Sequence, residues 1–162
     1  GKETSEAVEG NFAWYQGIKI SLFDVSNVSH PIQVDKYIIG DRGSDSLALT
    51  DHKAFLFDRA KQLLVIPVRV AEINESQYPG GVPSWAYGVP VWQGAYVFNI
   101  TLAGFVPKGG VTHMEGASSI WDSRYYVKRE LYIDNVLYTV SEKKIKMNSL
   151  KDLTEIKEIQ LS

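Results

Sequence analysis

Two segments of this chain recur later in it, in the same order and at nearly the same spacing. Residues 22–26 (LFDVS) match residues 97–101 (VFNIT) at an offset of 75, and residues 52–58 (HKAFLFD) resemble residues 128–134 (KRELYID) at an offset of 76. Both members of the second pair are followed by a short apolar segment. A plain β-sandwich yields chance matches of this kind, but the shared order and offset favour a duplicated unit.

Apolar residues alternate with polar ones in several short segments, as strands with one buried face require. Residues 18–22 alternate strictly, and further strands are expected at 34–39, 54–57, 95–98, around Val111, and at 126–133, 136–140 and 143–147. Residues 63–68 (LLVIPV) are almost continuously apolar, which predicts a strand covered on both faces. Pro67 predicts a bulge or a strand end there, because proline cannot donate a ladder hydrogen bond.

These strands predict an all-β fold of antiparallel four-stranded sheets. Removing most of a long loop at residues 72–92 from the repeat offset leaves a period of roughly 50–55 residues, near the ~40–50 of propeller blades. We therefore expect a partial β-propeller of about two and a half blades. It has a lead-in at 1–10, a half blade at 11–40, a blade at 52–115 that contains the 72–92 insertion, and a blade at 124–162.

The end of the chain leaves one alternative open. Leu150, Leu153, Ile156 and Ile159 recur every three residues after Ser149, a residue that could cap a helix. Residues 149–161 are therefore either a strand or a helix, and the all-β pattern favours the strand.

Composition excludes several classes of function. The 162 residues suit one domain, and their formal net charge is −2 with no basic stripe, which argues against a nucleic-acid partner. No apolar run approaches the ~20 residues of a membrane-spanning helix. Cysteine is absent, which excludes disulfides, thiol catalysis and cysteine-ligated metals. We expect no cofactor and no metal.

Most of the chain outside the 72–92 loop resembles one family of secreted archaeal and bacterial proteins. These proteins have a C-terminal β-propeller domain distantly related to WD repeats. The most specific segment is IGDRGSDSLALTDHKAFLFD (39–58), and the others lie at 12–34, 63–68, 94–100 and 127–159. The resemblance implies a sheet-repeat module of a secreted or membrane-anchored protein, with no catalytic residues to transfer. Because family members have further blades upstream, we expect a C-terminal fragment or an excised domain.

The loop at residues 41–52 is the best candidate for a polar site. Asp41, Asp45 and Asp51 could hold a hard cation, but their spacing does not match a known calcium loop. The favoured interpretation is structural: His52 and a nearby aspartate join a strand to its neighbour by hydrogen bonds, as WD-repeat blades do by analogy. A Ser–His–Asp site could be assembled from Ser44 or Ser119 with His52 or His113, but no G-x-S-x-G motif supports it.

The 72–92 loop is rich in aromatic residues, proline and glycine. It is longer than the ~12–15 residues beyond which a loop is usually functional or disordered. Tyr78, Trp85, Tyr87 and Trp92 could form a platform for sugar rings or for a partner's side chains. The same four residues could instead fold back as a lid over an exposed sheet face. The sequence leaves both interpretations open.

The favoured function is a non-catalytic binding or scaffold module at the cell surface, with a protein or glycan partner. The runner-up is a carbohydrate-active or other hydrolase with a site near loops 41–52 and 72–92. Open sheet edges predict self-association, unless loop 72–92 covers them. Glycosylation sequons at Asn27, Asn74 and Asn99 are compatible with an extracellular location.

Overall fold

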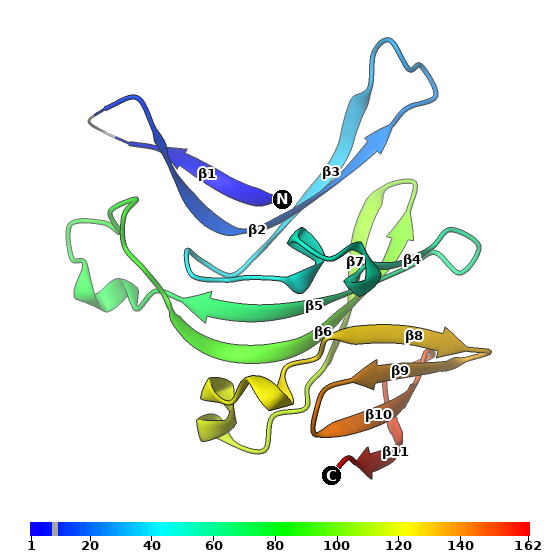
Figure 1. Ribbon diagram of the computed structural model, residues 1–162. Helices are drawn as coiled ribbons and strands as arrows, with labels where there is room; N and C mark the ends of the chain where they lie inside the picture. The colour runs from blue at the N-terminus through cyan, green and yellow to red at the C-terminus, as the bar shows by residue number, and fades with distance from the viewer. Residues whose placement is uncertain (8–9) are drawn as a thin grey trace.

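The computed structural model describes residues 1–7 and 10–162 and is all-β (Figure 1). Within these residues, three antiparallel sheets contain three, four and four strands. The rest consists of turns and short 3₁₀ helices. In the described part of the chain no helix has the length and apolarity needed to cross a membrane. The predicted partial propeller is confirmed.

The first sheet has the order β1-β2-β3, with β1 at Lys2–Glu6, β2 at Ala13–Asp24 and β3 at Ile32–Ile39. The prediction that residues 1–10 are a lead-in was wrong for residues 2–6, which pair with β2; residues 8 and 9 lie outside the described residues. The β1 segment is polar because it is an edge strand. Its Glu3 carboxylate lies 3.1 Å from the Lys36 ammonium of β3, across the sheet.

The middle sheet has the order β4-β5-β6-β7, with β4 at Leu56–Asp58, β5 at Leu63–Glu72, β6 at Val89–Thr101 and β7 at Gly104–Val111. Pairing of Glu72 with Val89 shortens the expected 72–92 loop to residues 73–88. The expected interruption at Pro67 is also wrong, because β5 continues there opposite Ala95. The Pro67 nitrogen and carbonyl face the edge of β5 along which β4 has already ended, so no strand there requires a hydrogen bond from residue 67. The Pro67 carbonyl accepts a hydrogen bond from Ser46 Oγ on that edge.

The third sheet has the order β11-β10-β9-β8, with β8 at Arg129–Ile133, β9 at Val136–Val140, β10 at Lys144–Ser149 and β11 at Glu155–Gln160. The strand β11 decides against a helix at 149–161. Asp134 adopts a φ of 52° in the tight turn between β8 and β9, a left-handed geometry that aspartate and asparagine tolerate.

The repeated segments occupy corresponding places in the sheets. Residues 22–26 and 97–101 lie at the ends of β2 and β6, each of which continues through a hairpin into the last strand of its sheet. Residues 52–58 and 128–134 lead into or contain the first strands, β4 and β8. The first sheet therefore lacks only the counterpart of β4 and β8.

The middle sheet lies between the other two, as Figure 1 shows. Side chains at even positions of β5, such as Leu64 and Ile66, pack with Ile18 and Ile39 of the first sheet. Those at odd positions, such as Val65, pack in a second core that includes Leu137 of the third sheet. Burial on both faces explains the continuously apolar segment at residues 63–68.

Candidate functional site

Loop 73–88 brings three of its predicted aromatic residues to the surface. Trp85 is 58% exposed and Tyr87 is 66% exposed, and the Tyr78 and Trp85 rings meet edge to face with centroids 6.2 Å apart. Trp92 lies apart from them, because β6 begins before it. Its ring packs 4.9 Å from that of Tyr96 against the core beneath the first sheet. Trp92 is thus part of the packing beneath the first sheet, whereas Trp85 and Tyr87 are exposed, and the binding platform stays a prediction.

An arginine joins this loop to the first sheet. The Arg42 guanidinium carbon lies 4.4 Å from the ring centroid of Trp14 on β2 and 5.5 Å from that of Tyr87. The backbone N–H of Gly88 donates to the Arg42 carbonyl at 2.7 Å, which aligns the two loops. Gly43 allows this approach, since it has a φ of 111° and a Cβ there would lie 2.7 Å from the Tyr87 ring.

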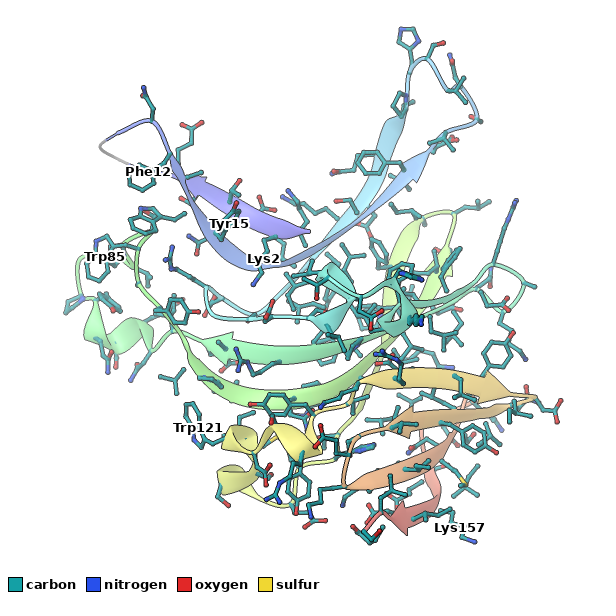
Figure 2. All side chains as sticks on the ribbon, in the orientation of Figure 1. Lys2, Phe12, Tyr15, Trp85, Trp121 and Lys157 are labelled. Atoms are coloured by element: carbon teal, nitrogen blue, oxygen red, sulfur yellow. The ribbon has the colours of Figure 1, made fainter. Side chains whose placement is uncertain are left out.

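Residues of the first hairpin complete the surface. Phe12 packs edge to face on Trp14 with centroids 5.1 Å apart, and Phe12 and Tyr15 are both largely exposed. The Gln16 side-chain amide donates to the Ser84 carbonyl at 2.9 Å and ties β2 to the loop. Figure 2 shows Phe12, Tyr15 and Trp85 at the same end of the molecule. We call this surface the aromatic corner; its members are Phe12, Trp14, Tyr15, Arg42, Tyr78, Trp85 and Tyr87.

A recess of about 520 Å³ opens beside the aromatic corner. Tyr15, Gln16, Arg42 and Tyr87 line it, together with residues of the N-terminal strand. Aromatic faces, a guanidinium and a side-chain amide offer stacking and hydrogen-bond donors to one partner.

The three aspartates of loop 41–52 have separate roles. Asp41 accepts a hydrogen bond from the backbone N–H of Ile73 at 2.7 Å, and the Asp45 carboxylate lies 3.1 Å from the Lys2 ammonium. Asp51 accepts from the backbone N–H of Lys53 and pairs with Arg129 of β8 at 2.6 Å. Nowhere in the described residues do three potential ligands gather for a metal ion. Each of these three carboxylates thus has its own structural partner.

His52 does not make the predicted bond to an aspartate. Its side chain is exposed at the start of the 3₁₀ helix His52–Ala54, and it has no hydrogen-bonded carboxylate among the residues described. The Asp51–Arg129 pair makes the connection between the loop and β8 instead. A long arginine side chain suits this position, because its guanidinium reaches from β8 to the carboxylate in loop 41–52.

A buried histidine elsewhere makes the contacts of a structural tie. His113 is fully buried after β7, with Nδ1 2.9 Å from Ser141 Oγ and Nε2 2.8 Å from Thr139 Oγ1. Burial, reinforced by the nearby Lys146 and Lys144 charges, lowers the pKa of His113 to about 4, so the ring is neutral. A serine and a histidine are in contact here. However, both ring nitrogens are bonded to hydroxyls out of reach of any substrate.

The other residues considered for a Ser–His–Asp site also have structural contacts. Ser44 is buried, and its hydroxyl bonds to the carbonyl and the amide of Ala71. The Ser119 hydroxyl donates to the Gly116 carbonyl and accepts from the Glu115 amide. Neither serine meets a histidine in these bonds, so the described residues assemble no triad from them.

The comparisons with known proteins agree with this architecture. A family model described as a beta propeller domain matches residues 1–153. No curated protein and no solved structure matches the chain.

Proposed function

This chain belongs to the beta propeller domain family, and from that premise we propose that it is a non-catalytic binding module whose contact surface is the aromatic corner. The observation that supports this proposal most directly is the stack of Trp14, Arg42 and Tyr87 beside the exposed Trp85. Tryptophan, tyrosine and arginine dominate the binding energy of known interfaces, because each offers a large contact area with a polar group. The partner is a protein or a glycan outside the cell.

Two features support an extracellular location. The chain resembles secreted proteins, and two of its three sequon asparagines, Asn27 and Asn74, are exposed in turns or loops. Asn74 also caps the 3₁₀ helix Glu75–Gln77, through its side-chain oxygen. Asn99 is half-buried within β6 and is a poorer acceptor for a glycan.

Self-association remains part of the proposal. The outer face of the third sheet exposes apolar side chains, among them Leu131, Ile133 and Ile159. An uncovered face of this kind is suited to pairing with another surface. Light scattering at high concentration tests it, and a strict monomer would remove this part of the proposal.

The test of the main proposal compares exposed aromatic residues at two places. Trp85→Ala and Tyr87→Ala remove rings from the aromatic corner, and Trp121→Ala removes an equally exposed ring from the 3₁₀ helix Ala117–Trp121, at a distance from it in Figure 2. Panels of polysaccharides and of extracellular proteins serve as probes. We expect about tenfold weaker binding for each corner variant and unchanged binding for Trp121→Ala, with unchanged melting temperatures.

Trp92→Ala provides the opposite control. Its ring belongs to the core, so this substitution should lower the melting temperature even when no partner is present. A partner that binds the Trp85 and Tyr87 variants as well as the unmodified chain would disprove the proposed surface. Turnover of a glycoside or an ester that depends on Asp51 or His52 would favour a hydrolase instead.

A further inference from the structure

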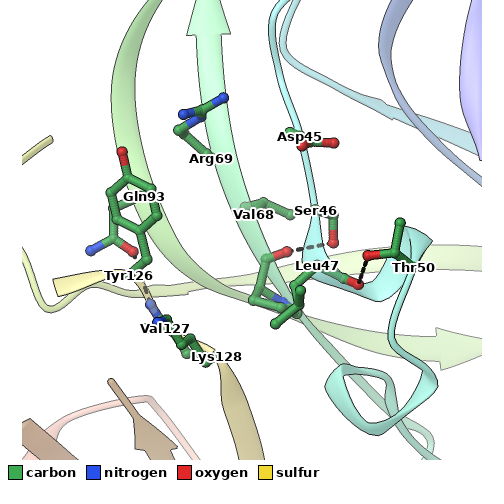
Figure 3. A pocket seen from close by; sticks show the side chains of 11 residues that line it. Asp45, Ser46, Leu47, Thr50, Val68, Arg69, Gln93, Tyr126, Val127 and Lys128 are labelled. Atoms are coloured by element: carbon green, nitrogen blue, oxygen red, sulfur yellow. Dashed lines mark hydrogen bonds between the residues drawn. The ribbon is translucent and has the colours of Figure 1, made fainter. Parts of the chain in front are cut away.

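A second cavity lies between the middle and third sheets, away from the aromatic corner. Its volume is about 270 Å³, and Figure 3 shows the residues that line it. Its floor is the segment from Pro67 to Arg69 of β5. One wall is the segment 45–50, which is joined to β5 by a bridge between Asp45 and Arg69, and the other is residues 126–128, which lead into β8.

Arg69 is the unusual member of this lining. It follows the apolar segment of β5 on the face that looks toward the third sheet, where Leu63 and Val65 belong to the core. Its Nε–H is buried without a hydrogen-bond partner, and within the described residues its guanidinium forms no ion pair. Its guanidinium carbon lies 5.9 Å from the ring centroid of Tyr126. A buried donor without an acceptor indicates a missing ligand or water.

The charged neighbours of Arg69 are already engaged. The Asp45 carboxylate pairs with Lys2, and Figure 3 shows it directed away from the guanidinium. The Lys128 ammonium pairs with Glu142. No carboxylate therefore neutralises Arg69, and no second cation of the lining competes for a ligand.

The uncharged polar groups of the lining are engaged as well. Ser46 Oγ donates to the Pro67 carbonyl, and Thr50 Oγ1 donates to the Leu47 carbonyl. The Gln93 amide donates to the Tyr125 carbonyl and accepts from the Val127 amide. Arg69 is thus the group of the cavity that retains a hydrogen-bond donor, its Nε–H, without a partner.

We propose that this cavity binds a carboxylate carried on a short apolar stem, with Arg69 as the anchor. A guanidinium fork matches a planar carboxylate in a bidentate arrangement. The side chains of Leu47 and Val127 and the ring of Tyr126 supply apolar walls for the stem. A phosphate would require a cluster of backbone N–H groups or several cations, and the lining offers a single unpaired cation.

Titrations followed by NMR of the whole chain test the site with three probes. These are 4-methylpentanoate, its neutral isostere 4-methylpentanamide, and inorganic phosphate. We expect the carboxylate to bind in the millimolar range and to shift the Arg69 Nε–H signal, with the amide and phosphate about tenfold weaker. Equal binding of the amide or of phosphate would contradict the assignment.

Variants of two arginines distinguish binding at this cavity from general attraction of the probe to positive charge. Arg69→Gln should weaken binding of 4-methylpentanoate about tenfold and Arg69→Lys several-fold, because lysine keeps the charge but loses the fork. Arg59→Gln, at an exposed arginine in the turn before β5, should leave binding unchanged. Binding to Arg69→Gln within about twofold of the unmodified chain would overturn the proposal. A well-dispersed spectrum establishes that each variant is folded, and Arg69→Lys provides the test should Arg69→Gln fail to fold.

A further pair of probes identifies the source of the carboxylate. A leucine-terminated tripeptide with a free C terminus represents a protein end, and the same peptide with an amidated C terminus is its control. Tighter binding of the free peptide than of 4-methylpentanoate assigns the site to a protein terminus, and the reverse order assigns it to a small organic acid. Loss of both interactions in Arg69→Gln is required in either case.

Discussion

The two faces of the middle sheet are covered by different chemistry. The face toward the first sheet is apolar and aromatic, with Phe98 at its centre among Tyr37, Tyr96 and Phe105. The contact with the third sheet has an apolar core too, but it also buries His113 and Glu130. One interface therefore depends mainly on apolar packing, and the other depends on packing together with the protonation of buried groups.

Glu130 is the group that most distinguishes the second interface. It lies on the same face of β8 as Tyr132 and opposite Thr139 of β9, and it is 7% exposed. Neither carboxylate oxygen has a hydrogen-bond partner within the described residues. Burial raises the pKa of Glu130 to about 8, although the Arg129 charge acts in the opposite direction. At neutral pH this carboxyl is mostly protonated.

The largest effect is expected at the apolar interface. Phe98→Ala deletes a fully buried ring and should lower the free energy of unfolding by about 4 kcal/mol at every pH. The control, Phe57→Ala, removes a half-exposed ring of β4 and should cost less than about 1 kcal/mol. Urea denaturation measures both, and a small loss for Phe98→Ala would show that this interface does not hold the sheets together.

The next effect is a pH dependence at the other interface. Because the pKa of Glu130 is higher in the folded chain than in the unfolded one, its contribution to stability is complete below pH 4.5 and is lost as the pH rises through about 8. Glu130→Gln cannot ionise and should be more stable than the unmodified chain by about 3 kcal/mol at pH 7. Unfolding curves from pH 4 to 9 that are parallel for the two proteins would refute this.

A smaller effect of opposite sign is expected from His113. Its pKa is lowered on folding, so its contribution to stability is present above pH 6.5 and is lost as the pH falls toward 4. In the Glu130→Gln background, where the opposing titration is absent, stability should fall by about 2 kcal/mol between pH 7 and pH 5. Adding His113→Gln should remove that dependence, and its persistence would assign it to another group.

The strand pattern and the repeat predicted most of the fold, and the error at β1 has a physical cause. Alternation and the apolar segment at 63–68 report burial, so they locate strands that pack in a core. The strand β1 is stabilised by edge pairing and by ion pairs such as Glu3–Lys36, which leave no apolar pattern. The predicted interruption at Pro67 was wrong because proline lacks an N–H only on the edge of β5 along which β4 has ended, where no strand requires that hydrogen bond.

The candidate site was predicted only in part, because half of it comes from another sheet. The loop composition pointed to Tyr78, Trp85 and Tyr87, but Trp14 and Arg42 join them only through the packing of the first sheet against the loop. The cluster FAWY at residues 12–15 was a visible signal for these aromatic residues. Strand parity places Glu130 on the same face as Tyr132, but apolar residues stand on both faces of β8, so the sequence does not indicate which face is buried.

The position of β5 has a consequence for how the molecule comes apart. This strand has a sheet over each face, β6 along one edge, and β4 followed by the segment 41–45 along the other, so its amide hydrogens exchange only when these backbone hydrogen bonds open. Opening of either outer layer alone leaves it sealed on the other side. The opening of β5 therefore requires the full free energy of unfolding. Each outer sheet separates at a lower free energy, with its own dependence on pH.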